Sequence, residues 1–198
     1  MLFWYSVTVN NNNKEMILLH LFKKICSSRF CWFLLFLAGC GLEACGLYFQ
    51  YKLDLQPCIN CVYERAYFLG FVFIGFLGAL AGNLLIVRFA CSLGFLLSSI
   101  GGLIVTFEHY AAYTGMEGYA AKCKLTTNFP SFLPLDDIAP FMFKAFAMCN
   151  EKLDWSFLGQ SMPFWILVIF LFSTLIAALM FISNFVKDKV NTFVNLYK

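Results

Sequence analysis

The sequence predicts an all-α membrane protein, in which four transmembrane helices form a bundle and a long outer loop joins the third helix to the fourth. Hydrophobic residues make up 61% of the 198 residues and charged residues only 13%, whereas a soluble domain has about 25% charged residues. The 25 phenylalanines exceed what one buried core of this size holds and suit a surface that faces lipid. The composition excludes a water-soluble globular fold.

Four apolar windows support this fold class, because a helix needs roughly 20 apolar residues to cross a bilayer. The windows cover residues 30–49, 66–81, 89–107 and 164–186, and the second continues a helix that we expect to begin near Cys58. Lipid offers no partner to backbone N–H and C=O groups, so helices are expected. The alternating ten-residue segments of a transmembrane barrel are absent from the sequence.

Two features inside the windows concern packing. Glu43 falls near the middle of the first window, where a carboxylate is costly, so we expect it to be protonated or paired across the bundle. Its role, structural or functional, stays open. Seven glycines have the small-residue pattern that lets helices pack closely: Gly39, Gly41, Gly46, Gly78, Gly82, Gly101 and Gly102.

The windows divide the chain into a cytoplasmic segment (1–29), a membrane domain (30–186) with outer loops at 50–57 and 108–162, and a cytoplasmic tail (187–198). Either Met1 or Met16 can be the start.

The orientation follows from the basic residues, since eight of the 14 lie in the two tails and the turn at Arg88, while five are spread through the longer loops. We expect residues 141–149 to form a short amphipathic helix on the membrane surface and the long loop to receive a protein partner.

The net charge of +3 is too small and too dispersed to indicate nucleic-acid binding. The nine cysteines are more informative, and this topology sorts them into two groups. Five lie near the cytoplasmic side or within the windows, where a small apolar thiol fills space: Cys26, Cys31, Cys40, Cys45 and Cys91. The other four lie on the outer, oxidising side: Cys58, Cys61, Cys123 and Cys149.

Cys58 and Cys61 form a Cys-x-x-Cys motif after Pro57, which suits the first position of a helix. A helix N-terminus stabilises a thiolate and makes such a pair readily exchangeable. Metal binding would need two further ligands, and we expect no metal at this motif. Arg65 lies four residues after Cys61 and seven after Cys58, on the same helical face. It is either an interfacial arginine that reaches the lipid phosphates or a donor to negative charge on sulfur or on an oxygen-bearing cofactor.

Cys123 and Cys149 enclose 25 residues of the long loop. One interpretation is a structural disulfide between them. The other is a second exchangeable pair, which a relay of electrons by thiol–disulfide exchange requires.

A family resemblance rests on several of these segments in order. They are Leu42-Glu43 and Tyr48-Phe49-Gln50, the run from Pro57 to Arg65, Phe107-Glu108-His109, Phe132 to Asp136, Cys149, Trp155 to Gly159, and Met162-Pro163. From about Trp32 to Phe185 the chain resembles the DsbB family of disulfide bond formation proteins of the bacterial inner membrane.

The resemblance implies a protein-disulfide oxidoreductase that reoxidises the soluble periplasmic thiol oxidase DsbA and passes two electrons through two cysteine pairs to ubiquinone or menaquinone. It implies that Cys61 faces the quinone, that Cys149 exchanges with Cys58, and that Cys123 meets DsbA. Arg65 would hold a quinone oxygen, and His109 would lie near the quinone headgroup.

Two alternatives remain open on the sequence. One is a DsbI-like paralogue, which would use the same chemistry with a dedicated partner. The other is a non-catalytic membrane protein whose outer loop is stapled by two disulfides. Reduction potential separates the non-catalytic alternative from a thiol relay, because structural disulfides have reduction potentials below about −300 mV and relay disulfides do not.

Overall fold

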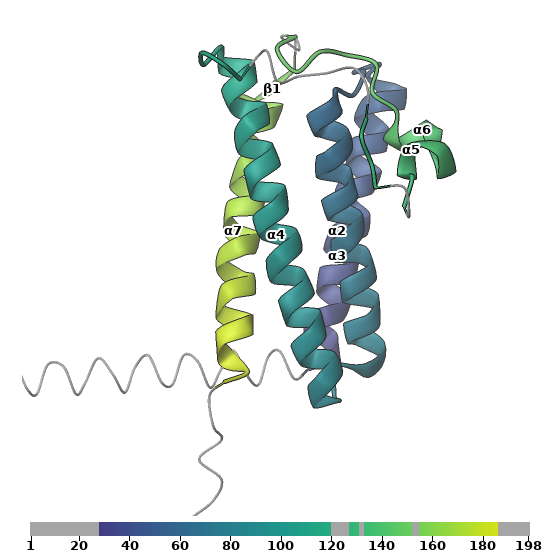
Figure 1. The fold of residues 1–198 in the computed structure, drawn as a ribbon, viewed down its shortest axis with the longest axis vertical. Coiled ribbons are helices and arrows are strands. Elements are labelled where there is room, and N and C mark those ends of the chain that lie inside the picture. The colour runs from purple at the N-terminus through teal and green to yellow at the C-terminus, as the bar shows by residue number, and fades with distance from the viewer. Residues whose placement is uncertain (1–27, 120–126, 131–132, 152–154, 186–198) are drawn as a thin grey trace, which may run out of the picture.

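The computed structural model describes residues 28–119, 127–130, 133–151 and 155–185. Within these ranges four long helices stand side by side (Figure 1): α2 (Arg29–Lys52), α3 (Ile59–Ala81), α4 (Leu85–Thr114) and α7 (Met162–Ser183). Each is long and apolar enough to cross a membrane. The predicted fold class, a four-helix membrane bundle, is confirmed.

The helices pack as a row that is open on one side. α2 packs on α3, α3 on α4, and α4 on α7, while α2 and α7 share no comparable interface within the described residues. The core between them is aromatic: the rings of Phe68 and Phe170 stack with centroids 4.6 Å apart, and Phe71 meets Phe95 at 5.0 Å. This arrangement leaves a gap between α2 and α7 over one face of α3.

The helices run past several of the predicted ends, because polar residues at those ends find partners across the bundle. The third window was expected to stop at residues 89 and 107, yet α4 starts at Leu85 and includes Arg88 and His109. Arg88 Nε donates to Asn184 Oδ1 at 3.1 Å, and His109 pairs with Glu64. A polar side chain that is hydrogen-bonded inside the bundle does not end a helix.

The loop between α4 and α7 carries short elements: α5 (Leu135–Ile138), α6 (Pro140–Phe143) and a hairpin of β1 (Ser156–Phe157) with β2 (Gln160–Ser161). The prediction of a helix over residues 141–149 was wrong beyond Phe143. After Lys144 the chain extends, and the N–H groups of Phe146 and Ala147 both donate to Pro57 O, at 2.9 and 3.2 Å. These bonds fix the loop against the start of α3.

The glycines of the helices differ in how closely they are packed. A Cβ added at Gly102 would overlap the ring of Phe170, and one at Gly78 would overlap Trp32. Gly41, which the sequence assigned to the same close-packing role, has open space around it.

We therefore expect Gly102→Ala to lower the free energy of unfolding by about 1–3 kcal/mol, the usual cost of overpacking a filled core. Gly41→Ala is the matched control on α2, and it should leave stability unchanged or slightly raised. Thermal unfolding of both variants in the same detergent measures the difference. Equal unfolding temperatures would contradict the packing of α4 on α7.

Candidate redox site

Two free thiols stand at the start of α3. Cys58 is the N-cap residue, and its Sγ accepts the backbone N–H of Cys61 at 3.4 Å. Pro57 precedes the cap rather than occupying the first helical position as predicted. The two sulfur atoms lie 3.2 Å apart and both cysteines are free, with Cys58 buried and Cys61 half-buried. The motif is thus compact and sits at the positive end of the helix dipole.

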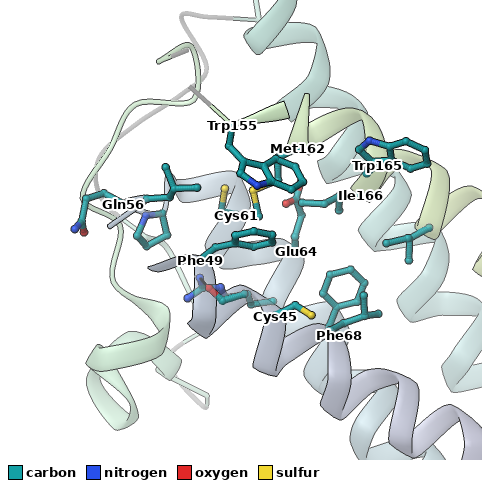
Figure 2. Close-up of a pocket in the computed structure, with 16 residues that line it drawn as sticks. Cys45, Phe49, Gln56, Cys61, Glu64, Phe68, Trp155, Met162, Trp165 and Ile166 are labelled. Atoms are coloured by element: carbon teal, nitrogen blue, oxygen red, sulfur yellow. Dashed lines mark hydrogen bonds between the residues drawn. The ribbon is translucent and has the colours of Figure 1, made fainter. Parts of the chain in front are cut away.

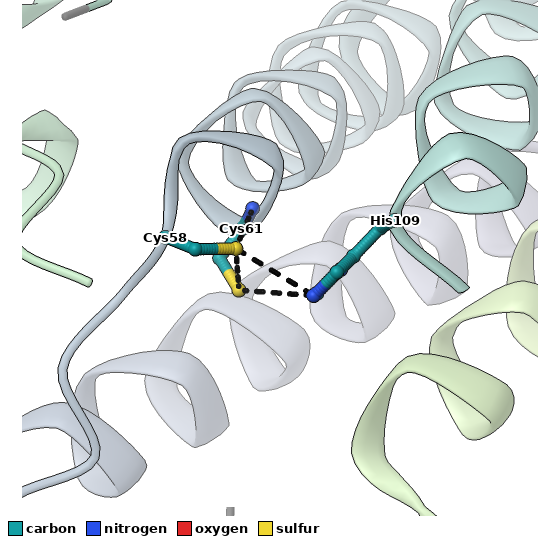
Figure 3. A group of neighbouring side chains, drawn as sticks. All are labelled: Cys58, Cys61 and His109. Atoms are coloured by element: carbon teal, nitrogen blue, oxygen red, sulfur yellow. Dashed lines mark hydrogen bonds between the residues drawn. The ribbon is translucent and has the colours of Figure 1, made fainter. Parts of the chain in front are cut away.

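His109 of α4 faces these thiols (Figure 3). Its Nε2 lies 3.5 Å from Cys58 Sγ and 4.0 Å from Cys61 Sγ. Its Nδ1 lies 2.9 Å from Glu64 Oε1, and both side chains are buried. An ionised Glu64 only accepts hydrogen bonds, so it fixes the imidazole proton on Nδ1 and turns the basic Nε2 toward sulfur.

The three donor atoms, two sulfurs and one nitrogen, lie within 4.8 Å of one another. Such donors are also those of zinc sites, but a structural zinc site takes four protein ligands. Among the described residues no other histidine, cysteine or carboxylate has a ligand atom within 4.8 Å of all three. The arrangement is a thiol–imidazole–carboxylate cluster, and we assign it no metal.

Arg65 lies one turn further along α3 and ties α3 to α2 and the loop. It donates to Gln50 Oε1 at 2.6 Å, to Met142 O at 3.0 Å and to Gly46 O at 2.9 Å. A guanidinium carries five N–H donors. Three are engaged within the described residues, which leaves two for another acceptor.

A cavity of about 240 Å³ occupies the gap between α2 and α7 (Figure 2). Its walls are mainly apolar and aromatic, with Phe49, Phe68, Trp155 and Trp165 among them. Its polar lining includes Cys61, Glu64, Arg65 and Gln56. It also includes Cys45, which was expected only to fill space. His109 is not among the lining residues, since it meets the thiols from the side of α4.

The second cysteine pair is only partly within the described residues. Cys149 is disulfide-bonded and buried, in a cluster with Cys58, Ile59 and Ala112. The cysteines at 31, 40, 45, 58, 61 and 91 are free, so none of them is its partner. Cys123 lies outside the described residues. The structure thus brings Cys149 beside the first pair.

Two buried carboxylates lie in the membrane helices. Neither oxygen of Glu43 has a hydrogen-bond partner among the described residues, so of its two expected states, protonated or paired across the bundle, the paired one is not seen. Glu64 was quoted only as part of the Cys-x-x-Cys segment and was given no role, yet it is 1% exposed and bonds His109. Its position in a membrane helix is the signal that could have singled it out.

The helices and this cluster define a multi-pass membrane protein with a closely spaced pair of free thiols at the start of a membrane helix. Residues 28–180 match the family described as Disulfide bond formation protein DsbB. The chain belongs to that family, and it is a disulfide-bond-forming membrane oxidoreductase.

Relatives named "Disulfide bond formation protein B" resemble the chain over most of their length. The Pasteurella multocida protein is 41% identical over 170 residues, which cover 84% of this chain and 93% of the relative. The Photobacterium profundum protein is 37% identical over 85% of this chain and 95% of the relative. The protein of Haemophilus influenzae strain KW20 is 38% identical over 87% and 96%.

Proposed function

We propose that this protein reoxidises a DsbA-like thiol oxidase of the bacterial periplasm and delivers two electrons to ubiquinone or menaquinone in the inner membrane. Electrons enter at the Cys123–Cys149 pair, pass to Cys58 and Cys61, and leave to the quinone. Both termini are cytoplasmic and the loop between α4 and α7 faces the periplasm. The observation that carries the proposal is a disulfide-bonded Cys149 packed beside a free Cys58–Cys61 pair.

Exchange between the two pairs needs their sulfur atoms to meet. The backbone bonds from residues 146 and 147 to Pro57 O hold the Cys149 segment against the N-terminus of α3. Once Cys58 and Cys61 have been oxidised to a disulfide by the quinone and Cys149 has been released as a thiolate by the partner's thiol, the exchange can begin. Attack by Cys149 on Cys58 would then break the Cys58–Cys61 disulfide and form a Cys149–Cys58 bond. Cys61 would leave as a thiolate, whose charge the N-terminus of α3 stabilises. Burial of Cys149 keeps water and other thiols away from this step.

The cavity beside Cys61 fits a quinone. Its aromatic and aliphatic walls suit a ring with a hydrophobic tail, and it lies between α2 and α7, two helices long and apolar enough to cross a membrane. Arg65 has two N–H donors left for a carbonyl oxygen, and Cys61 would stand beside the ring. A bound quinone supplies an acceptor of two electrons that is stronger than DsbA. That His109 also lies near the quinone headgroup stays a prediction.

The test is quinone reduction by the purified protein with reduced DsbA as the electron donor. We expect turnover that depends on both thiol pairs. The stapled, non-catalytic alternative predicts no turnover and reduction potentials below about −300 mV for the disulfides. Absence of turnover with ubiquinone and with menaquinone analogues would overturn the proposed function. A dedicated partner in place of DsbA would show as turnover with that partner alone.

A further inference from the structure

One buried oxygen atom has no partner in the site described above. Glu64 is 1% exposed, and its Oε1 bonds His109, but its Oε2 has no hydrogen-bond partner among the described residues. A buried carboxylate oxygen without a partner is costly and needs an explanation. Glu64 also lines the cavity beside Cys61 (Figure 2), whereas His109 does not.

Glu64 therefore connects two places that are otherwise separate. On one side it holds the imidazole that faces the sulfur atoms of Cys58 and Cys61 at 3.5 and 4.0 Å. On the other side it borders the cavity that the proposed function assigns to the electron acceptor. Arg65, which follows Glu64 in the sequence, donates its hydrogen bonds toward α2 and the loop, and Glu43 makes no hydrogen bond with either residue of the pair.

We propose that Glu64 and His109 form a proton-transfer pair that carries protons from the Cys58 and Cys61 thiols to the acceptor in this cavity. The proposal rests on the proposed function. Converting the two thiols to a disulfide releases two electrons and two protons, and converting a quinone to a hydroquinone takes up the same two electrons and two protons. A route for the protons is needed because Cys58, Glu64 and His109 are all buried.

The pair moves one proton at a time. A thiol proton passes to Nε2 of His109, and the Nδ1 proton passes to Glu64. The carboxyl group then rotates and delivers that proton to an acceptor oxygen in the cavity. Exchange of the imidazole tautomer returns the pair to its starting state before the second proton moves. His109 touches a reacting sulfur atom and acts as its base, while Glu64 positions it and faces the acceptor.

The alternative is that Glu64 only anchors His109 and the fold. Glu64→Gln separates these roles, because the amide oxygen still accepts the Nδ1 proton in a hydrogen bond but the side chain no longer takes up a proton. Glu108→Gln is the matched control, since Glu108 adjoins His109 on α4 but lies outside the cluster and borders a different cavity. Both variants should keep the wild-type unfolding temperature in detergent.

The first measurement is the rate at which protein with both thiols reduced converts a short-chain ubiquinone analogue in a single turnover, in H₂O and in D₂O. We expect Glu64→Gln to slow this step about tenfold, less than a full loss of acid–base catalysis because the hydrogen bond remains. We also expect a solvent isotope effect that differs from that of the wild type. A purely structural role would leave the isotope effect unchanged.

The second measurement needs no acceptor: the rate of alkylation of the two reduced thiols by iodoacetamide at a fixed pH near neutrality. Loss of the carboxylate weakens His109 as a base, so Glu64→Gln should react more slowly than Glu108→Gln. His109→Gln should slow both measurements, and the double variant should be no slower than His109→Gln alone, because both residues serve one route.

Wild-type rates and isotope effects in Glu64→Gln would overturn the proton-transfer pair, and so would independent, additive effects of the two substitutions. Failure of the wild type to reduce quinone would instead overturn the proposed function. If Glu64→Gln does not purify as a folded protein, the isotope effect and alkylation rate of His109→Gln test the proton-transfer pair instead, because His109 is the member that contacts the thiols.

Discussion

Replacing Cys149 with serine should stop turnover and trap a covalent adduct between Cys123 and the thiol oxidase supplied in its oxidised form. The variant has no loop disulfide, so the free Cys123 thiolate attacks the partner's disulfide, forms a mixed disulfide and releases the partner's other thiol. Without Cys149 no second loop thiol can attack Cys123 and release the partner, so the adduct accumulates. Peptide mass spectrometry of the trapped complex identifies the cysteine that carries the partner.

The position of Cys149 supports this division of labour. Its side chain is 1% exposed and packs with Cys58, and a backbone bridge between Cys58 and Ala147 holds the loop against the start of α3. A soluble protein cannot reach a thiol buried this deeply. Cys123 lies between Lys122 and Lys124 in the sequence, and these charges favour its thiolate as a leaving group.

Two further variants serve as controls for this experiment. Cys123→Ser should form little adduct, because the entry point is lost. Cys40→Ser removes a half-buried thiol of α2 and should behave as the wild type. An adduct found mainly on Cys149, in a protein whose Cys123 is intact, would exchange the two roles.

The sequence predicts the four helices well because each of them must be apolar over about 20 residues to lie in lipid. It predicts helix ends less well. Arg88 and His109 look like the limits of an apolar window, but each is hydrogen-bonded inside the bundle, to Asn184 and Glu64. Such partners are fixed by tertiary packing, which the hydrophobic pattern does not encode.

The candidate site divides in the same way. The Cys-x-x-Cys motif and Arg65 share one helical face by spacing alone, so the sequence could place them together. The contact of Glu64 with His109 joins residues 45 positions apart, and the cavity depends on α2 and α7 not closing against each other. The helix expected at residues 141–149 does not continue beyond Phe143, because N–H groups of the loop bond Pro57 O instead.

Arg65→Ala should raise the apparent KM for quinone about ten- to a hundredfold, because the variant loses a charge-assisted hydrogen bond of roughly 1.5–3 kcal/mol. Steady-state rates across a quinone titration, with reduced DsbA in excess, measure the change. The substitution also removes the three hydrogen bonds of Arg65 to α2 and the loop. Their loss leaves buried carbonyl oxygens without donors, so the variant should also unfold at a lower temperature.

A second substitution separates binding from packing. Gln50→Ala removes the side chain that accepts from Arg65 and that donates to Phe141 O, but it keeps the guanidinium beside the cavity. We expect it to lower the unfolding temperature with little change in the KM for quinone. Arg65→Lys should recover part of the affinity through its charge, without the forked geometry. If Gln50→Ala raised KM as much as Arg65→Ala does, Arg65 would act by holding the loop in place, and the quinone contact would have to be assigned to other residues of the cavity.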